Sequence, residues 1–449
     1  MNVVAIILAA GQGTRMKSAL PKPLHEVGGM PMLAWSLNAA QAVGASRIVT
    51  VLPPHSETTQ SWLGDIEFAI QENARGTGHA VLAAKDKLAG FLGVALVMFG
   101  DTPLITAATL SQLTQCIKDG ADLAVLGFHA ADPTGYGRFI CAENGQLNAI
   151  IEHKDANDAE RQIDFVNGGV MAVACPLLFD LLDAVSDDNA SGEIYLTDIV
   201  HIANARDHKV VTCKTDEAEI TGVNNRADLA KVEGIIQSRL RSAALDQGVT
   251  MRAPETVFLS ADAIIERDVI IEPHVVIGTG THIGEGSIIK SFSHLEGASL
   301  GPCCIIGPYA RLRPGTIAGD GVKIGNFVET KNTNLAAGAK ANHLTYLGDA
   351  MIGEQANIGA GTITCNYDGT NKFKTLIGDG AFIGSNSALV APVRIGANAI
   401  VGAGSTITSD VSDDAIAIAR GKQKNIDNAA TSFRARAQDK KQKNNNQKK

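Results

Sequence analysis

The feature that most constrains this chain is a six-residue repeat in its second half. Large aliphatic residues recur at every sixth position in two runs: Ile265, Ile271, Ile277, Ile283, Ile289 and Leu295, then Ile377, Ile383, Leu389, Ile395, Val401 and Ile407. Glycine follows several of them. Such a period predicts short strands that each send one aliphatic side chain to an interior column, with three strands closing a triangular coil and the coils stacking as a parallel β-helix.

Hexapeptide repeats of this type resemble the left-handed β-helix of acyltransferases, and the expected handedness rests on that resemblance. The period is interrupted between about residues 301 and 375. Loops emerge where a solenoid is interrupted, and loops commonly carry chemistry. We therefore expect a functional site within this interruption.

The first half follows a different pattern, in which β-rich runs alternate with helical ones. We predict strands at 3–8, 47–52, 66–70, 94–99 and 122–128, and helices at 32–43, 78–87 and 109–117. This alternation predicts an α/β domain with a mostly parallel, Rossmann-like sheet covered on both faces. Ligands of such sheets collect at the carboxyl ends of the strands.

The two patterns divide the chain into domains. We assign residues 1–225 to the α/β domain and 249–430 to the β-helix. Between them, residues 226–248 are expected to form a helical linker, because Leu229, Val232, Ile236 and Leu240 recur at helical spacing. Residues 431–449 are basic and poor in apolar side chains, so we expect a disordered tail.

Charge and cysteine content exclude several classes of protein. The net charge of −8 argues against a nucleic-acid-binding protein, because such proteins need a basic face. Seven cysteines without a C-x-x-C pair argue against a disulfide framework or a zinc site and favour a reducing cytoplasm. No apolar stretch approaches the roughly 18 residues of a membrane span. We expect a soluble, cytoplasmic protein.

The segment LAAGQGTRM follows the first predicted strand, and Met16 stands where a dinucleotide-binding loop would have its third glycine. Its backbone N–H groups and Arg15 suit phosphate oxygens, although a tight strand-to-helix turn would have the same pattern. Lys22 follows in LPKPLH, and the two segments together resemble the signature of sugar-nucleotide pyrophosphorylases. Asp101 follows a strand in VMFGDTPL, where a carboxylate can hold Mg²⁺ or can simply cap a helix or turn.

Further motifs extend this resemblance along the whole chain: QENARGTGHA, DPTGYGRF, IIEHKDA, FVNGGV, GVNNR, ARLRPG, GNFVETK, ANHLTYLGDA, NIGAGTITCNYDG, KFKT and GSNSALVAPV. The chain closely resembles the bifunctional bacterial N-acetylglucosamine-1-phosphate uridyltransferase and glucosamine-1-phosphate N-acetyltransferase. The resemblance implies two reactions of cell-envelope precursor synthesis. Acetyl-CoA acetylates glucosamine 1-phosphate, and the product takes a uridylyl group from UTP with Mg²⁺ as cofactor, which gives UDP-N-acetylglucosamine and pyrophosphate.

The resemblance implies a UTP and UDP-N-acetylglucosamine site made of Leu8, Ala9, Ala10, Gly11, Arg15, Lys22, Gln71, Gly76, Thr77, Phe99, Gly100, Asp101, Gly137, Glu152, Asn167 and Asn224. Gln71, Gly76 and Thr77 would frame the uracil, and a glutamine offers a donor and an acceptor to a base edge. Gly137, Glu152 and Asn167 would line the N-acetylglucosamine pocket. Asp101 and Asn224 would hold Mg²⁺. Gln12 stands where many relatives have lysine, which leaves Arg15 and Lys22 with more of the phosphate charge.

For acetyl transfer, the resemblance implies that His343 is the general base, since an imidazole changes protonation near neutral pH and can accept the proton that the sugar amine loses. We hypothesise that Glu329 orients this imidazole; a solvated carboxylate is the alternative. The glucosamine 1-phosphate pocket would contain Arg313, Lys331, Tyr346 and Asn357, whose two cations suit a phosphate. Acetyl-CoA would contact Ala360, Asn366, Tyr367, Ser385, Ala403 and Arg420.

Two alternatives remain open from the sequence. The chain could be a single-activity pyrophosphorylase whose β-helix only oligomerises or regulates, or a nucleotide-sensing trimeric scaffold without enzymatic activity. In the second case, His343→Ala and Asp101→Ala would leave every activity unchanged. A homotrimer with acetyl sites between neighbouring β-helices is implied by the resemblance alone. The expected partners are otherwise small-molecule substrates, with neither nucleic acid nor membrane.

Overall fold

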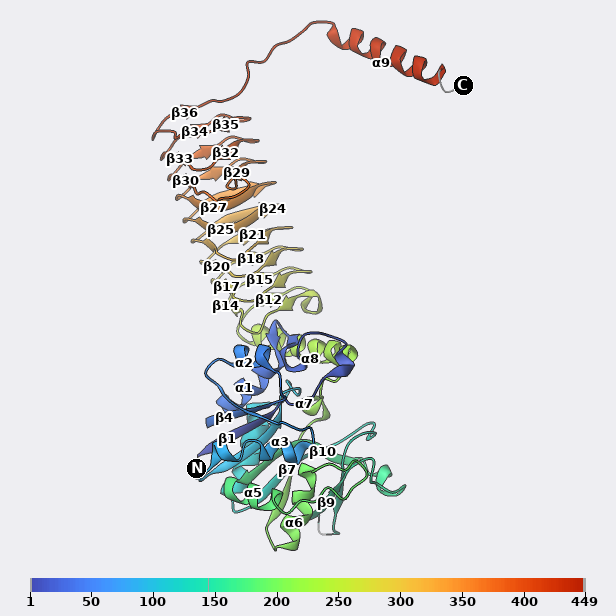
Figure 1. Cartoon of the computed structure of the whole chain (residues 1–449). Coiled ribbons are helices and arrows are strands. Elements are labelled where there is room, and N and C mark those ends of the chain that lie inside the picture. The colour runs from blue at the N-terminus through green and yellow to red at the C-terminus, as the bar shows by residue number, and fades with distance from the viewer. Residues whose placement is uncertain (1, 144, 447–449) are drawn as a thin grey trace. The chain divides into compact units, whose positions relative to one another are not determined.

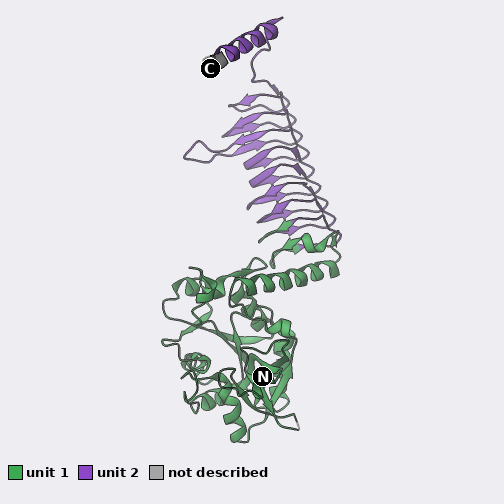
Figure 2. Cartoon of the chain, turned by 90° about the vertical axis from the view of Figure 1, so that its right-hand side faces the viewer, with its two compact units in different colours: residues 1–264, 276–281 green, residues 265–275, 282–449 purple. Residues whose placement is uncertain are grey.

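The structure is a computed structural model that describes residues 2–143 and 145–446. The chain forms two compact units (Figure 2): Met1–Ile264 with Val276–Thr281, and Ile265–Val275 with His282–Lys449. The boundary between the compact units therefore lies among the first coils of the repeat. Each unit is described by itself.

The first unit is built on one sheet whose main path runs β11-β7-β10-β6-β1-β4-β5. These strands are β1 (Val3–Leu8), β4 (Ala45–Leu52), β5 (Glu67–Ile70), β6 (Val94–Phe99), β7 (Leu123–His129), β10 (Phe165–Ala174) and β11 (Val210–Lys214). All pairings on this path are parallel except those of β10, which lies antiparallel between β6 and β7. The predicted mostly parallel sheet is confirmed, and β10 and β11 are the strands of this path that the sequence patterns did not predict.

Helices cover both faces of the sheet (Figure 1). One face packs against α3 (Thr77–Leu82), α5 (Cys175–Leu182) and α6 (Ile199–Ala205), and the other against α1 (Met32–Ala42), α2 (Glu57–Leu63) and α4 (Ala107–Lys118). Alternate residues of β1 divide between these two cores, with Val4 and Ile6 in the first and Ala5 and Ile7 in the second. This alternation explains why β1 is apolar throughout.

The helix predicted at 78–87 is wrong in its extent. α3 ends at Leu82, and a 3₁₀ turn at Asp86–Leu88 follows. The amide of Leu88 donates to the carbonyl oxygens of Ala84 and Lys85, and Ala84 and Leu88 are both buried in the core. The tighter turn keeps these two side chains on the buried face.

Smaller elements complete the first unit: β2 (Glu26–Val27), β3 (Met30–Pro31), β8 (Arg138–Cys141), β9 (Leu147–Ile151), α7 (Glu217–Ile220), α8 (Arg226–Asp246), β12 (Thr250–Met251) and β13 (Phe258–Leu259), which pairs with β16 (Val276–Ile277). The helix predicted at 226–248 is thus present as α8. Its first turn is closed by a capping box between Asn225 and Asp228. Val232 and Ile236 bury one face of α8 against Met16 and Val27.

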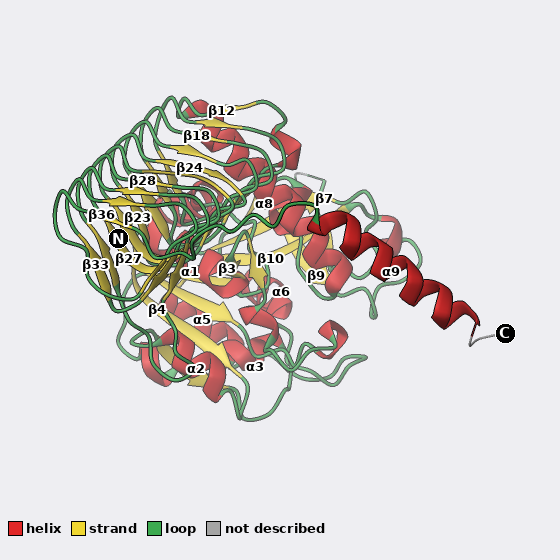
Figure 3. Cartoon of the chain, turned by 90° about the horizontal axis from the view of Figure 1, so that it is seen from above, coloured by secondary structure: helices red, strands yellow, loops and turns green. Residues whose placement is uncertain are grey.

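The second unit is a parallel β-helix, the left-handed type that its hexapeptide repeat indicates, and Figure 3 shows its short strands joined by turns in a regular stack. One column of strands contains β15 (Ile270–Ile271), β18 (Ile288–Ile289), β21 (Ile305–Ile306), β24 (Lys323–Asn326), β26 (Lys340–His343), β28 (Asn357–Ile358), β31 (Phe382–Ile383), β34 (Ile400–Val401) and β36 (Ile416–Ala417). The others are β14 (Ile264–Ile265), β17 (His282–Ile283), β19 (His294–Leu295), β20 (Ala298–Leu300), β22 (Arg311–Leu312), β23 (Thr316–Ala318), β25 (Glu329–Leu335), β27 (Tyr346–Ile352), β29 (Ile363–Cys365), β30 (Thr375–Ile377), β32 (Ala388–Val390), β33 (Val393–Ile395) and β35 (Thr406–Ile407).

The aliphatic residues of the repeat form the interior of the coils. All twelve residues of the two six-residue runs are buried, which confirms the prediction made from their period. Glycines allow the coils to approach one another. A Cβ atom on Gly284 would lie 2.6 Å from the carbonyl carbon of Gly301, and one on Gly378 would lie 2.6 Å from the amide nitrogen of Ala397. No side chain fits at these positions.

One corner of the coils carries a column of stacked rings. His274, Phe292, Tyr309 and Phe327 stack with centroid separations of 5.0, 4.9 and 5.2 Å. Each of these residues has a positive φ, which a bulky side chain rarely adopts. Contact between rings in successive coils helps to offset that backbone cost.

The C-terminal segment differs from the prediction. The expected disorder over 431–449 is contradicted through residue 446, because α9 (Ala429–Asn446) is a helix; residues 447–449 lie outside the described chain. Alanine, arginine, glutamine and lysine are good helix formers, which explains how a polar segment becomes helical. Among the described helices, none is long and apolar enough to cross a membrane.

Candidate active sites

A pocket of about 320 Å³ opens in the first unit at the carboxyl ends of neighbouring strands. Leu8 and Phe99 are the last residues of β1 and β6, and Gln71 follows the end of β5. Parallel strands end at the same edge of a sheet, so residues distant in sequence converge there. The lining includes eleven of the predicted residues: Leu8, Ala9, Ala10, Gly11, Lys22, Gln71, Gly76, Thr77, Phe99, Gly100 and Asp101.

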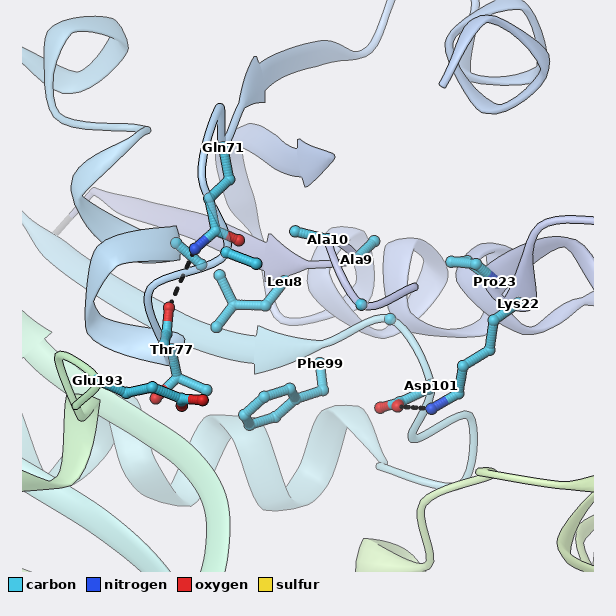
Figure 4. Close-up of a pocket in the computed structure, with 15 residues that line it drawn as sticks. Leu8, Ala9, Ala10, Lys22, Pro23, Gln71, Thr77, Phe99, Asp101 and Glu193 are labelled. Carbon is cyan, nitrogen blue, oxygen red and sulfur yellow. Dashed lines mark hydrogen bonds and ion pairs between the residues drawn. The ribbon is translucent and has the colours of Figure 1, made fainter. Parts of the chain in front are cut away.

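One end of the pocket is formed by Gln71 and Thr77, and the other by Lys22 and Asp101 (Figure 4). The side-chain amide of Gln71 donates to the carbonyl oxygen of Gly76 at 3.1 Å and faces His79 Nδ1 at 3.2 Å. Gly76 has φ +102°, and a Cβ atom there would lie 2.6 Å from the carbonyl oxygen of Ile194. Only glycine fits this turn. With its amide nitrogen engaged, Gln71 presents Oε1 as an acceptor.

The other end of the pocket is charged. Lys22 Nζ lies 2.5 Å from Asp101 Oδ2 and 3.1 Å from Asn224 Oδ1. Arg15 also donates to Asn224 Oδ1 at 2.9 Å, although Arg15 is exposed and does not line the pocket. The amide of Val223 donates to the carbonyl oxygen of Asp101 at 2.9 Å, which holds the two oxygen-bearing segments together. The predicted phosphate-binding and metal-binding residues therefore meet at one point.

Asp101 and Asn224 fit a magnesium ion by their chemistry. Both are hard oxygen donors, and both already converge on a single cationic atom, Lys22 Nζ. Within residues 2–143 and 145–446, no group of three or more His, Cys, Asp or Glu side chains could hold a metal ion. A magnesium ion at this pair would therefore keep water or substrate phosphate as its other ligands.

The three residues predicted to bind the sugar also lie together. The backbone amide of Asn167 donates to the carbonyl oxygen of Gly137 at 2.8 Å. A Cβ atom on Gly137 would lie 3.5 Å from Glu152 Oε1, so Gly137 is a direct neighbour of that carboxylate. Burial raises the pKa of Glu152, and a hydrogen bond from Thr197 at 3.0 Å opposes this rise. Leu196 joins this group to the main pocket, since its amide donates to Thr77 Oγ1.

In the second unit, His343 lies at the end of β26, opposite Asn326 of β24. Its Nδ1 donates to Asn326 Oδ1 at 2.9 Å, which makes Nε2 the nitrogen that can accept a proton. The hypothesis that Glu329 orients the imidazole is therefore not supported. Glu329 instead pairs with Arg313 at 2.9 Å, and Asn326 occupies the orienting position because it stands one coil before the histidine.

Three residues predicted to contact acetyl-CoA occupy the position equivalent to His343 in the following coils. Ile358, Ile383 and Val401 are in register, and Ala360, Ser385 and Ala403 each follow them by two residues. Hydrogen bonds connect this column, from the Asn386 amide to the Ala360 carbonyl at 2.7 Å and from the Gly404 amide to the Ser385 carbonyl at 2.8 Å. Arg420 donates to the Ala403 carbonyl oxygen at 2.5 Å and extends the column.

Of the remaining predicted residues, Lys331 lies on β25 and Tyr346 on β27, whereas Arg313 follows β22 and Asn366 follows β29. Arg313 and Lys331 form a cationic cluster with Lys372, and the neighbouring Lys372 lowers the pKa of Lys331, with Arg313 contributing to the same direction. The Tyr346 hydroxyl and Asn366 both approach Gly348, and Asn366 also donates to Asp349 at 2.5 Å. Two predicted residues stand apart from these contacts. Asn357 lies opposite Lys340 of β26, and Tyr367 is on an exposed hairpin where its hydroxyl donates to Gly369.

Several lining or supporting residues were not identified from sequence: Pro23, Ala74, Ala80, Glu193, Thr197, Asn326 and Lys372. The alanines and proline carry no chemical signature. Asn326 could have been found from spacing, because three hexapeptides place coil neighbours about 18 residues apart, and Asn326 is 17 residues before His343. Lys372 lies within the quoted KFKT segment, and its proximity to Lys331 depends on the hairpin.

Comparisons with known proteins agree with both halves of this description. Residues 5–189 match the family described as MobA-like NTP transferase domain, and residues 262–297 and 374–409 match the family described as bacterial transferase hexapeptide (six repeats). Proteins named Bifunctional protein GlmU match nearly the whole chain. That of Ruegeria sp. (strain TM1040) is 52% identical, with 95% of each chain covered. That of Maricaulis maris is 52% identical, covering 99% of this chain and 98% of the relative, and that of Sphingopyxis alaskensis is 50% identical, covering 94% of each.

Proposed function

The chain belongs to the family of bifunctional GlmU proteins, and from that premise we propose how its residues make UDP-N-acetylglucosamine in two steps. The β-helix transfers an acetyl group from acetyl-CoA to glucosamine 1-phosphate. The α/β unit then transfers a uridylyl group from UTP to N-acetylglucosamine 1-phosphate. The observation that carries this proposal is that one chain holds both a nucleotide-sized pocket with a cation-binding end and a histidine with Nε2 as its basic nitrogen.

In uridylyl transfer, a phosphate oxygen of the sugar 1-phosphate attacks the α-phosphorus of UTP, and the bond to the departing pyrophosphate breaks. Negative charge gathers on the phosphate oxygens, so the reaction depends on placed cations. Lys22 and Arg15 bind these oxygens. Asp101 and Asn224 would hold Mg²⁺, which supplies further positive charge when bound. At the far end, Gln71 Oε1 accepts the N3–H of uracil, because its amide nitrogen is already engaged.

The acceptor sugar lies against Gly137, Glu152 and Asn167. The Glu152 carboxylate, which adjoins Gly137, accepts hydrogen bonds from sugar hydroxyl or acetamide groups. The hydrogen bond from Thr197 holds that carboxylate in place.

In acetyl transfer, the amine of glucosamine 1-phosphate attacks the thioester carbonyl and the thiol of coenzyme A leaves. His343 Nε2 accepts the proton lost by the amine, while Nδ1 remains bonded to Asn326. Arg313 and Lys331 bind the sugar phosphate, and Lys372 adds to the positive charge there. Tyr346 and Asn357 bind the sugar. The coenzyme lies along Ala360, Ser385 and Ala403 with Asn366 and Tyr367 nearby, and Arg420 binds one of its phosphates.

We also propose a cytoplasmic homotrimer in which a neighbouring copy supplies the second wall of the acetyl-transfer site. The column from His343 to Ala403 supports this, because it is a line on one side of the coils rather than an enclosed pocket. Light scattering after gel filtration should give three times the monomer mass of 46.9 kDa. A monomer with full acetyl transfer would contradict the assembly.

The experiment that tests the function uses the purified full chain with glucosamine 1-phosphate, acetyl-CoA, UTP and Mg²⁺, each omitted in turn. UDP-N-acetylglucosamine should require all four. Coenzyme A thiol should still appear without UTP, and pyrophosphate should still appear when N-acetylglucosamine 1-phosphate replaces the first two substrates. Absence of thiol release with normal pyrophosphate release would instead support the single-activity pyrophosphorylase.

A further inference from the structure

Arg138 is a buried cation outside the residues assigned to either reaction. It is the first residue of β8, and its exposed fraction is 1%. Its Nε has no hydrogen-bond partner among the described residues, and none of the ion pairs found there joins Arg138 to a carboxylate. A buried guanidinium without a carboxylate partner is costly, so a purely structural role would be better served by an apolar side chain.

The other nitrogens of Arg138 bind three separate points of the backbone and side chains. Nη1 donates to the carbonyl oxygen of Tyr136. Nη2 donates to the carbonyl oxygen of Arg161 at 3.2 Å and to His153 Nδ1 at 3.2 Å. A guanidinium can make these contacts together because its donors are fixed in one plane, which a lysine ammonium cannot reproduce.

Two of the three contacts, with Tyr136 and His153, lie directly beside a residue proposed to bind the sugar. Tyr136 precedes Gly137, and His153 follows Glu152. Arg138 itself follows Gly137 and pairs in the sheet with Val166, the residue before Asn167. The Arg138 side chain therefore links the segments that carry Gly137 and Glu152, and its backbone pairs beside Asn167.

We propose that Arg138 is a positioning residue for N-acetylglucosamine 1-phosphate, which sets the spacing of its pocket without touching the substrate. This inference rests on the proposed function of that pocket. It predicts a selective effect, because two contacts of Arg138 lie beside the sugar-binding group, whereas Gln71 and Gly76 of the main pocket are held by their own hydrogen bonds.

The test measures pyrophosphate release by Arg138→Lys and Arg138→Ala with each substrate varied. We expect kcat/KM for N-acetylglucosamine 1-phosphate to fall about 10- to 100-fold, since small misplacements of binding groups have effects of this size. KM for UTP should stay within about two-fold, because its site is held separately. Guanidinium ion at millimolar concentration should partly restore Arg138→Ala, whereas ethylammonium should not.

Arg161→Ala is the matched control, since it removes an arginine side chain but keeps the carbonyl oxygen that Arg138 binds. It should behave as the wild type does. Thermal unfolding of each variant reports whether the first unit is folded. Equal loss in both substrates, no loss, or a loss that follows the unfolded fraction would overturn the role of Arg138. A wild-type protein that releases no pyrophosphate would instead overturn the proposed function.

Discussion

The two sites of this chain are assembled in opposite ways. The site of the first unit gathers Leu8, Gln71 and Phe99 at the ends of three strands that the sheet order brings together, and Asn224, more than two hundred positions after Leu8, joins them through Lys22. The site of the second unit is built from neighbouring coils, so that Asn326 meets His343 only 17 residues later. The first site depends on the strand order of the sheet, and the second depends on the register of successive coils. Substitutions should therefore affect their own reaction and leave the other intact.

The largest difference between the effects on the two reactions is expected for His343→Ala. Loss of a general base lowers a rate by about 10²- to 10⁴-fold, so acetyl transfer should nearly disappear. Uridylyl transfer should be unchanged, because His343 is not part of the first unit. Thiol release and pyrophosphate release measured on the same preparation check both expectations. His294→Ala removes another exposed coil histidine and serves as the control; an equal loss in that variant would show that coil integrity rather than proton transfer was affected.

The opposite result, loss of uridylyl transfer with acetyl transfer retained, is expected for Asp101→Asn. This substitution removes the negative charge that faces Lys22. Uridylyl transfer should fall about 100-fold, comparable to the loss of one electrostatic contact at a reacting centre. Higher Mg²⁺ concentrations should recover part of the rate, whereas acetyl transfer should not change. Asp183→Asn, in an exposed pair with Lys85, is the control. A magnesium dependence identical to that of the wild type would argue against a metal-binding role for Asp101.

A smaller effect is expected for Asn326→Ala, which removes the partner of His343 Nδ1. The imidazole would lose its fixed tautomer, and we expect kcat of acetyl transfer to fall about 10-fold. The pH dependence of kcat/KM should change as well, which a merely structural role would not produce. Asn334→Ala, on the exposed side of β25, is the control. An unaltered pH profile would return Asn326 to a structural role.

The smallest effect concerns the stability of the first unit. Because burial raises the pKa of Glu152 above its ordinary value of 4.5, the folded state binds that proton more tightly than the unfolded chain does. The resulting stabilisation is present at acidic pH and is lost as pH rises through the raised pKa. Glu152→Gln should therefore raise the unfolding temperature at pH 7.5, on the order of 2 °C, and weaken binding of N-acetylglucosamine 1-phosphate.

Calorimetry at pH 7.5 and pH 4 checks this sign. At the lower pH, where both states are largely protonated, the variant and the wild type should unfold at nearly the same temperature. Glu193→Gln alters another carboxylate near this group, whose charge raises the pKa of Glu152 less than burial does, and is the control. A stabilisation that is as large at pH 4 as at pH 7.5 would contradict an electrostatic origin.

The difference between topology and register also explains what could be predicted from sequence. The repeat predicted every buried aliphatic of its two runs, because each coil contacts only the next. The motifs predicted most of the first pocket, since its residues are chemically distinctive. β10 was missed because an antiparallel strand inserted between β6 and β7 leaves no periodic signal of its own. Glu329 was assigned the wrong partner because its carboxylate could accept a hydrogen bond from an imidazole. The neutral Asn326 is the residue in register with His343.

Sheet order in the first unit and coil register in the second also determine how each unit folds. In the first unit, β1 pairs with β6 across some ninety residues, and β7 pairs with β11 near Lys214, so the sheet closes only after most of its chain is available. In the β-helix, a formed coil templates the next, and the loop closed at each step stays short. We therefore expect the first unit to fold in a single cooperative event, and the β-helix to gain stability in increments as coils are added to its growing end.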